Sequence, residues 1–200
     1  MHFNLRNINI SGLGLKKSPP LKERIAEAIY RLDAQRNKLE QTSSKLHERD
    51  KEMFERCIGA KAANGNDDSR ANMYANECVE IRKMAKIVMS SHLALERVSL
   101  RLQTIEDFGD IMLQMAPVVG IVKETKGQLA GVIPEVAYEL DEINGMLNTT
   151  LAETGNTLTP DSTIEAANGE AKKVLEEASV VAEQKMNNIY PELPLPETEE

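Results

Sequence analysis

The residue types that most often bind metals or act as nucleophiles are scarce in this chain of 200 residues, which has three histidines and two cysteines. His2, His47 and His92 lie far apart, and neither an HExxH nor a CxxC spacing occurs. The Glu-x-x-His pair of a di-iron bundle is also missing, because Ser44 and Met89 stand three residues before His47 and His92. No GxxxxGK[ST] loop that would cradle phosphates is present. We therefore expect no catalytic residue, no metal site and no cofactor, and predict that the protein is not an enzyme.

Basic side chains repeat every seven residues along the first part of the chain, at Arg24, Arg31, Lys38 and Lys45. On an α-helix, which turns by about 100° per residue, this spacing places them in one basic ribbon along one flank. Such a ribbon could contact a neighbouring subunit or an anionic membrane, near which each Lys or Arg contributes about 1 kcal/mol. It could equally be an ordinary solvated helix face, stabilised by pairs four residues apart such as Glu27 with Arg31.

A Leu/Pro segment close to the end of the chain has the composition of a docking peptide. Prolines favour the extended polyproline II conformation, so such a segment loses little conformational entropy when it enters a groove on a partner. The alternative is a disordered terminus in which the prolines are incidental. The residues that we assign to partner binding are Tyr190, Pro191, Leu193, Pro194, Leu195 and Pro196.

The elements that must carry these side chains are two long helices. Apolar residues recur at heptad spacing in two adjacent stretches, with a short polar break at residues 64–68 between them. The first stripe holds Ile25, Leu32, Leu39, Leu46 and Met53, and the second holds Tyr74, Cys78, Ile81, Ala85, Val88, His92, Leu95 and Leu102. Two long helices with one facing stripe each predict an antiparallel hairpin over about residues 19–108.

This hairpin gives the histidine and the cysteines within it a structural interpretation. His92 falls in the seam, so we interpret it as a partnered interior or edge imidazole and not as a ligand. With the turn near Gly65, Cys57 lies opposite about Tyr74 and well short of Cys78. We therefore expect two buried free thiols in a reducing cytoplasm.

Shorter helices are predicted after the hairpin, over residues 110–155, packed against one of its ends. Residues 111–122 are apolar but broken at Pro117, and the helical pattern restarts around Pro134. A Thr-, Gly- and Asn-rich linker at 155–160 leads to a capping box at 162–165 and an Ala-rich stripe that continues to about residue 188. The predicted fold class is all-α: a long antiparallel helical hairpin with shorter helices at one end, a C-terminal amphipathic helix and a flexible Pro-rich tail.

These elements divide the chain into four predicted parts. They are a flexible N-terminal segment at 1–18, a helical core at 19–155, a linker with an acidic C-terminal helix at 156–188, and a partner-binding tail at 189–200. The first segment could also be a short peptide that dips apolar side chains into a bilayer surface.

The net charge of −8 is concentrated in the C-terminal part. Residues 1–150 hold 21 basic and 21 acidic side chains, whereas residues 151–200 hold 3 and 11. Such polarity lets an acidic tail compete with other acidic surfaces for the basic first part of the chain. Nucleic-acid binding is not expected, because the basic residues lack interleaved aromatics. No stretch reaches the roughly 18 apolar residues of a membrane span.

Seven short segments together resemble the ESCRT-III family, and most closely its archaeal CdvB-type cell-division branch. The segments are LKERI at 21–25, AIYRL at 28–32, QRNKLE at 35–40, YANE at 74–77, IRKMAK at 81–86, LALERV at 93–98 and LAGVIPEV at 129–136. The resemblance covers about residues 21–155. The chain ends four residues after Pro196, where the longest CdvB member continues into a winged-helix-like extension, so we expect a shorter paralogue.

The resemblance implies a filament-forming, membrane-remodelling protein that acts in cell division. Its implied partners are copies of itself, paralogues in a mixed polymer, an anionic membrane surface, and an AAA ATPase whose MIT domain binds the Leu/Pro tail. It also implies a closed state in which the acidic C-terminal region folds back on the hairpin, and a cytoplasmic location at the inner face of the cell membrane, at the division site. The alternative from the residues alone is a soluble coiled-coil adaptor or chaperone that clamps protein clients.

Overall fold

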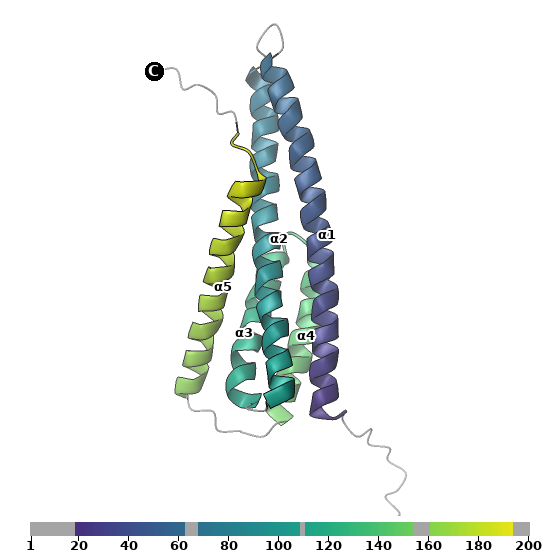
Figure 1. Ribbon diagram of the computed structural model, residues 1–200, viewed down its shortest axis with the longest axis vertical. Coiled ribbons are helices and arrows are strands. Elements are labelled where there is room, and N and C mark those ends of the chain that lie inside the picture. Colours follow the sequence, from purple (N-terminus) through teal and green to yellow (C-terminus); the bar gives the residue numbers. More distant parts are fainter. Residues whose placement is uncertain (1–18, 63–67, 109–110, 154–160, 194–200) are drawn as a thin grey trace, which may run out of the picture.

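The two heptad stretches form the two arms of a helical hairpin in the structure, a computed structural model that describes residues 19–62, 68–108, 111–153 and 161–193 (Figure 1). Helix α1 spans Leu21–Ala62 and α2 spans Asp68–Phe108. At 1.5 Å per residue, each arm is about 60 Å long. The carbonyl of Pro20 accepts the backbone N–H of Arg24 at 3.2 Å, which closes the first turn of α1. The predicted hairpin is therefore confirmed.

The apolar stripes meet in the seam between α1 and α2. The largest seam side chains that are fully buried are Ile25, Leu32, Leu39, Ile81, Leu95 and Leu102. Burial of one such side chain contributes roughly 1.5–3 kcal/mol, so the seam holds the arms together firmly. Four predicted stripe members, Leu46, Met53, Tyr74 and His92, lie at its edge and are only partly buried.

Both cysteines lie buried in the seam as free thiols, as predicted. The Cys57 thiol donates to the carbonyl of Ala71 at 3.3 Å, about one helical turn closer to the hairpin turn than Tyr74. The Cys78 thiol donates to the carbonyl of Asp50 at 3.8 Å. The two thiols therefore lie at different levels of the hairpin.

Helices α3 (Ile111–Leu129) and α4 (Pro134–Glu153) pack on one another and beside the half of the hairpin away from its turn (Figure 1). The carbonyl of Leu129 accepts the backbone N–H groups of Val132 and Ile133 at 2.9 and 2.8 Å, so the chain reverses tightly between them. Pro134 then takes the first position of α4, where its missing N–H is not needed. Packing at one end of the hairpin and the restart at Pro134 agree with the sequence.

The predicted break at Pro117 is wrong, because α3 runs through this residue without interruption. A proline inside a helix lacks the N–H that would reach the carbonyl four residues back, and its ring crowds that carbonyl. In α3 the proline is buried, and the neighbouring Val118, Ile121 and Val122 are buried in the main core. Burial of this apolar face offsets the lost hydrogen bond.

Helix α5 (Asp161–Ile189) packs on the outside of the first four helices and runs along α2 (Figure 1). It contacts α2 and α3, and its C-terminal end points toward the hairpin turn. Within the described ranges no helix carries an apolar stretch long enough to cross a membrane. Residues 1–18 and the linker predicted at 155–160 lie outside the described residues, as do the side chains of the capping box at 162–165.

Candidate functional site

Most of the buried α5 side chains at its contact with α2 and α3 are alanines, and Val174 and Leu175 pack beside them, partly buried. We use the name α5 dock for the contact that five buried α5 residues make with α2 and α3. These residues are Ala167, Ala171, Ala178, Ala182 and Met186. A Cβ atom added at Gly120 of α3 would lie 3.1 Å from the Cβ of Ala171. Glycine at 120 and alanine at 171 thus allow the two helices to approach closely, with little apolar area per residue.

Ion pairs along the α5 dock set its register. Arg101 of α2 pairs with Glu170, Arg97 with Glu177 at 3.2 Å, and Lys86 with Glu183 at 3.1 Å. Residue numbers fall along α2 as they rise along α5, so the two helices are antiparallel. The side chains in these pairs are 30–62% exposed, and exposed pairs contribute only about 0–1 kcal/mol each. The pairs therefore fix where α5 lies more than how strongly it binds.

Arg82 joins the hairpin seam to the chain that follows α5. Its Nε and Nη2 donate to Oδ1 and Oδ2 of Asp50 on α1 at 2.8 and 3.0 Å. Its Nη1 donates to the carbonyl of Pro191 at 2.7 Å, and its guanidinium lies 5.3 Å from the ring centroid of Tyr190. The His47 ring meets the same tyrosine edge-on, with centroids 5.4 Å apart. One arginine thus ties α1, α2 and the end of α5 together.

The electrostatics around Arg82 follow from burial. Asp50 is 2% exposed, and Arg82 donates one hydrogen bond to each of its carboxylate oxygens. Burial, and secondarily the Asp50 carboxylate, raise the pKa of the Tyr190 phenol. The same two causes raise the pKa of the Cys78 thiol to about 11. Both groups stay neutral near pH 7, so neither offers a nucleophile.

The predicted partner-binding tail begins inside this site. Tyr190 is 8% exposed and packs with Met186 against Ala85 of α2. Pro191 is held through its carbonyl, and Leu193 is half-buried. The other predicted positions, Pro194, Leu195 and Pro196, lie outside the described residues. Two of the six predicted tail residues therefore contact the hairpin of their own chain.

The structure divides the predicted basic ribbon into two halves. Arg24 pairs with Glu153, and Arg31 with Glu139 at 3.1 Å. Both acids belong to α4, so these two arginines hold α4 on α1.

The other two ribbon residues, Lys38 and Lys45, are exposed, and no carboxylate in the described part of the chain lies within ion-pair distance of either. Their side chains are thus available to a partner, whereas those of the first two are committed inside the fold.

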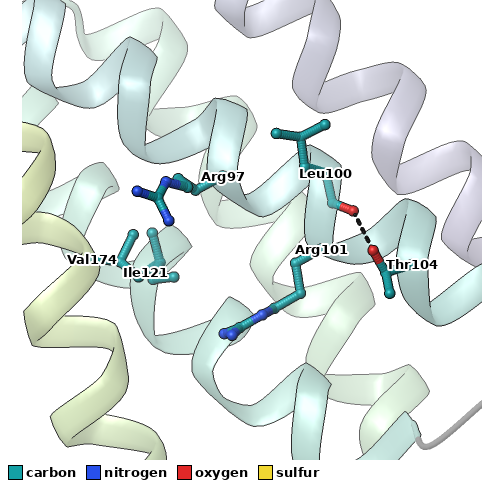
Figure 2. A pocket seen from close by; sticks show the side chains of 6 residues that line it. All are labelled: Arg97, Leu100, Arg101, Thr104, Ile121 and Val174. Carbon is teal, nitrogen blue, oxygen red and sulfur yellow. Dashed lines mark hydrogen bonds between the residues drawn. The ribbon is translucent and has the colours of Figure 1, made fainter.

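A groove lined by α2, α3 and α5 is an open feature that the sequence did not predict. It encloses about 420 Å³, and Figure 2 shows four of its lining side chains on α2, with one on α3 and one on α5 opposite. They are Arg97, Leu100, Arg101, Thr104, Ile121 and Val174. The Thr104 hydroxyl donates to the carbonyl of Leu100 at 3.1 Å, and both arginines are paired to α5 glutamates. The groove has an apolar floor and paired charges at its rim, which is not an arrangement for acid–base chemistry.

We also searched the described side chains for a metal site. Among them, no group of three or more His, Cys, Asp or Glu residues could hold an ion. His92 lies half-buried at the seam edge, as predicted, although no described residue forms a hydrogen bond with its ring.

The sequence interpretation predicted the Ala-rich stripe of α5 but missed its partners on the hairpin, above all Arg82, Lys86, Arg97 and Arg101. A signal for them exists in the spacing. Arg82 and Lys86 are four residues apart, as are Arg97 and Arg101, while Glu170 and Glu177 are seven apart. Each spacing places its members on one helix face. The spacing does not show whether the acidic α5 packs against the basic residues of α1 or against those of α2.

Two curated proteins of Sulfolobus acidocaldarius are similar to this chain over most of its length. Cell division protein B1 is 41% identical over 179 residues, which cover 90% of this chain and 83% of that protein. Cell division protein B is 37% identical over 184 residues, which cover 92% of this chain and 70% of that protein. No family model matches the chain, and no solved structure matches it. Identities of this size over these lengths show that the chain belongs to the CdvB-type family of archaeal cell-division proteins.

Proposed function

We propose that this protein acts in cell division as a filament subunit that remodels membrane, without catalytic activity of its own. The observation that carries the proposal is the α5 dock, where an acidic helix lies on a long hairpin through small side chains and exposed ion pairs. Such a contact suits a helix that docks and leaves. The relatives named as cell-division proteins supply the cellular process.

In this proposal, residues 19–155 form the assembling core and α5 closes it. Copies of the chain and its paralogues associate through hairpins once α5 has left. Lys38 and Lys45 face the anionic inner surface of the cell membrane, at the division site. Two lysines on one hairpin bind weakly, at about 1 kcal/mol each near a negative membrane. Many hairpins in one filament bind strongly, because each contact raises the effective concentration of the next.

The tail recruits the MIT domain of an AAA ATPase in this proposal. Because Tyr190 and Pro191 contact Arg82 in the closed form, the full segment at 190–196 is available only after the end of α5 has left the hairpin. ATPase binding then favours the open form by mass action.

Electron microscopy of the full chain and of residues 1–155 with anionic vesicles tests the function. We expect residues 1–155 to form filaments that decorate the vesicles, and the full chain to do so less. Monomers beside smooth, undecorated vesicles would contradict the proposal.

Reversal of two exposed charges separates membrane binding from a coiled-coil adaptor function. Arg24 and Arg31 are unsuitable, because their reversal would also detach α4. Lys38→Glu with Lys45→Glu should remove residues 1–155 from vesicles in a co-sedimentation assay. The matched control reverses Lys83 and Lys123, which are exposed on α2 and α3. If both double variants bind vesicles equally, Lys38 and Lys45 are not the contact surface. If the unmutated residues 1–155 do not bind vesicles either, an adaptor function is favoured.

A further inference from the structure

Both histidines in the described part of the chain lie where the C-terminal end of α5 meets the hairpin. His47 of α1 contacts the Tyr190 ring edge-on. His92 of α2 lines a separate cavity of about 250 Å³. The other residues that line this cavity are Leu39, Glu40 and Ser43 of α1, Met89 and Leu93 of α2, and Lys185 and Ile189 of α5. The imidazole of His92 is thus enclosed by three helices, one of which is α5.

Charged groups from all three helices surround His92. Arg36 and Glu40 come from α1, Glu96 from α2 itself, and Lys185 from α5. Burial is the main cause that lowers the pKa of His92 below its ordinary value, and the Arg36 cation comes next. The Glu96 and Glu40 carboxylates oppose this in part, and the Lys185 cation makes the smallest contribution of the five. The docked protein therefore holds His92 in its neutral form.

We propose that His92 makes the docking of α5 sensitive to mild acid, so that protonation of its ring favours release of the C-terminal half of α5. Release takes Lys185 and Ile189 away from the ring, which removes one cation and part of the apolar cover. The undocked form therefore binds a proton at His92 more tightly than the docked form does.

The direction with pH follows from this difference. The docked form has the lower pKa at His92, so the contribution of the neutral ring to docking is complete above the undocked pKa. It is lost as the pH falls below that value toward the docked pKa. Arg36 stays beside the ring in both forms, so only the part of the pKa lowering that is due to α5 is lost on release. We expect the undocked fraction to rise by about two- to fivefold between about pH 7.5 and about pH 5.5.

Hydrogen–deuterium exchange of the full chain at low concentration measures this directly. The readout is the exchange rate of the α5 amides at 182–189, divided by the intrinsic rate of an unprotected amide at each pH. We expect protection to fall by about two- to fivefold at the lower pH in the wild-type protein. His92→Gln should remove the difference, whereas His47→Gln, the matched histidine control, should keep it.

Lys185→Gln provides a second variant that leaves the hairpin untouched, because Lys185 is exposed on α5. It should reduce the response to pH only in part, since it removes the Lys185 cation but keeps the burial of the ring under α5, which is the larger cause. Unchanged protection in the wild-type protein, a full response in His92→Gln, or loss of the response in His47→Gln would each overturn the proposal. The readout is docking itself, so the result does not depend on whether the protein forms filaments or binds membranes.

Discussion

Helix α2 contributes to two interfaces of different chemistry. In the α1–α2 seam it packs large side chains such as Ile81, Leu95 and Leu102, all fully buried. In the α5 dock the buried α5 side chains are four alanines and Met186, with Val174 and Leu175 partly buried beside them. Burial of a Leu or Ile side chain stabilises the fold by roughly 1.5–3 kcal/mol. Burial of an alanine methyl stabilises it by only about 0.8 kcal/mol, the value for one CH₂ group. The comparison indicates that α2 binds α1 more strongly than α5, which is the difference that the proposed release of α5 requires.

The polar contacts of the two interfaces differ in the same way. In the seam, Asp50 is 2% exposed and receives two hydrogen bonds from Arg82. In the α5 dock, the ion pairs lie in solvent, with Arg97 62% and Glu177 44% exposed. Charges in solvent exchange one partner for another at small cost, and a buried carboxylate does not. Arg82 belongs to both interfaces, since it also holds the Pro191 carbonyl.

Arg82→Met is expected to have the largest effect, because Arg82 pairs with the buried Asp50 in the seam and also holds the Pro191 carbonyl after α5. Asp50 would keep its buried position without its counter-charge, and removal of one partner of a buried pair typically costs about 3–5 kcal/mol. We expect a loss of this size in the free energy of unfolding, measured by urea titration, together with faster exchange at 186–190.

The matched control for this prediction is Arg97→Met, whose partner Glu177 is exposed. It should change the unfolding free energy by at most about 1 kcal/mol. Equal losses in the two variants would contradict the contrast between a buried and an exposed ion pair on the same helix.

Leu32→Ala tests the seam alone. Leu32 is fully buried between the arms, and truncation of such a side chain costs about 2–5 kcal/mol through lost burial and the cavity left behind. Because the seam lies on the other side of α2, the exchange of α5 relative to that of the hairpin should stay unchanged. Leu100→Ala, at a position 56% exposed beside the α5 dock, should stay within about 0.5 kcal/mol of the wild type. A large loss from Leu100→Ala would show that the dock contributes as much apolar stabilisation as the seam.

The hairpin could be predicted from the sequence because its pattern is long and local. Stripes that continue over some 30 residues with no proline leave one helical solution, and their burial at Leu32, Leu39, Ile81 and Leu95 follows. The expectation at Pro117 was wrong for a non-local reason. Whether a proline ends a helix depends on what the surrounding turns bury, and the burial of Val118 and its neighbours in the core was not evident from their spacing.

The partner of each charged face could not be predicted from the sequence. Arg24 and Arg31 share their spacing with Lys38 and Lys45, yet only the first two meet α4, because α4 covers only one end of the hairpin. The Ala-rich stripe of α5 would likewise fit any smooth apolar face. It packs against α2 because of several weak contacts, such as the exposed ion pairs, whose residues lie far apart in the sequence.

Salt should affect the two interfaces differently, and this is the smallest effect that we predict. Raising NaCl from about 0.1 M to about 1 M shortens the Debye length from about 10 Å to about 3 Å, which screens the exposed pairs at Lys86, Arg97 and Arg101. The exchange of α5 amides should then rise by about two- to tenfold, since each exposed pair contributes about 0–1 kcal/mol. Amides of α1 around Leu39 should not respond, because the seam there is apolar. If α5 is equally protected at both salt concentrations, its buried contacts hold it on the hairpin, and its exposed ion pairs serve only to select the register.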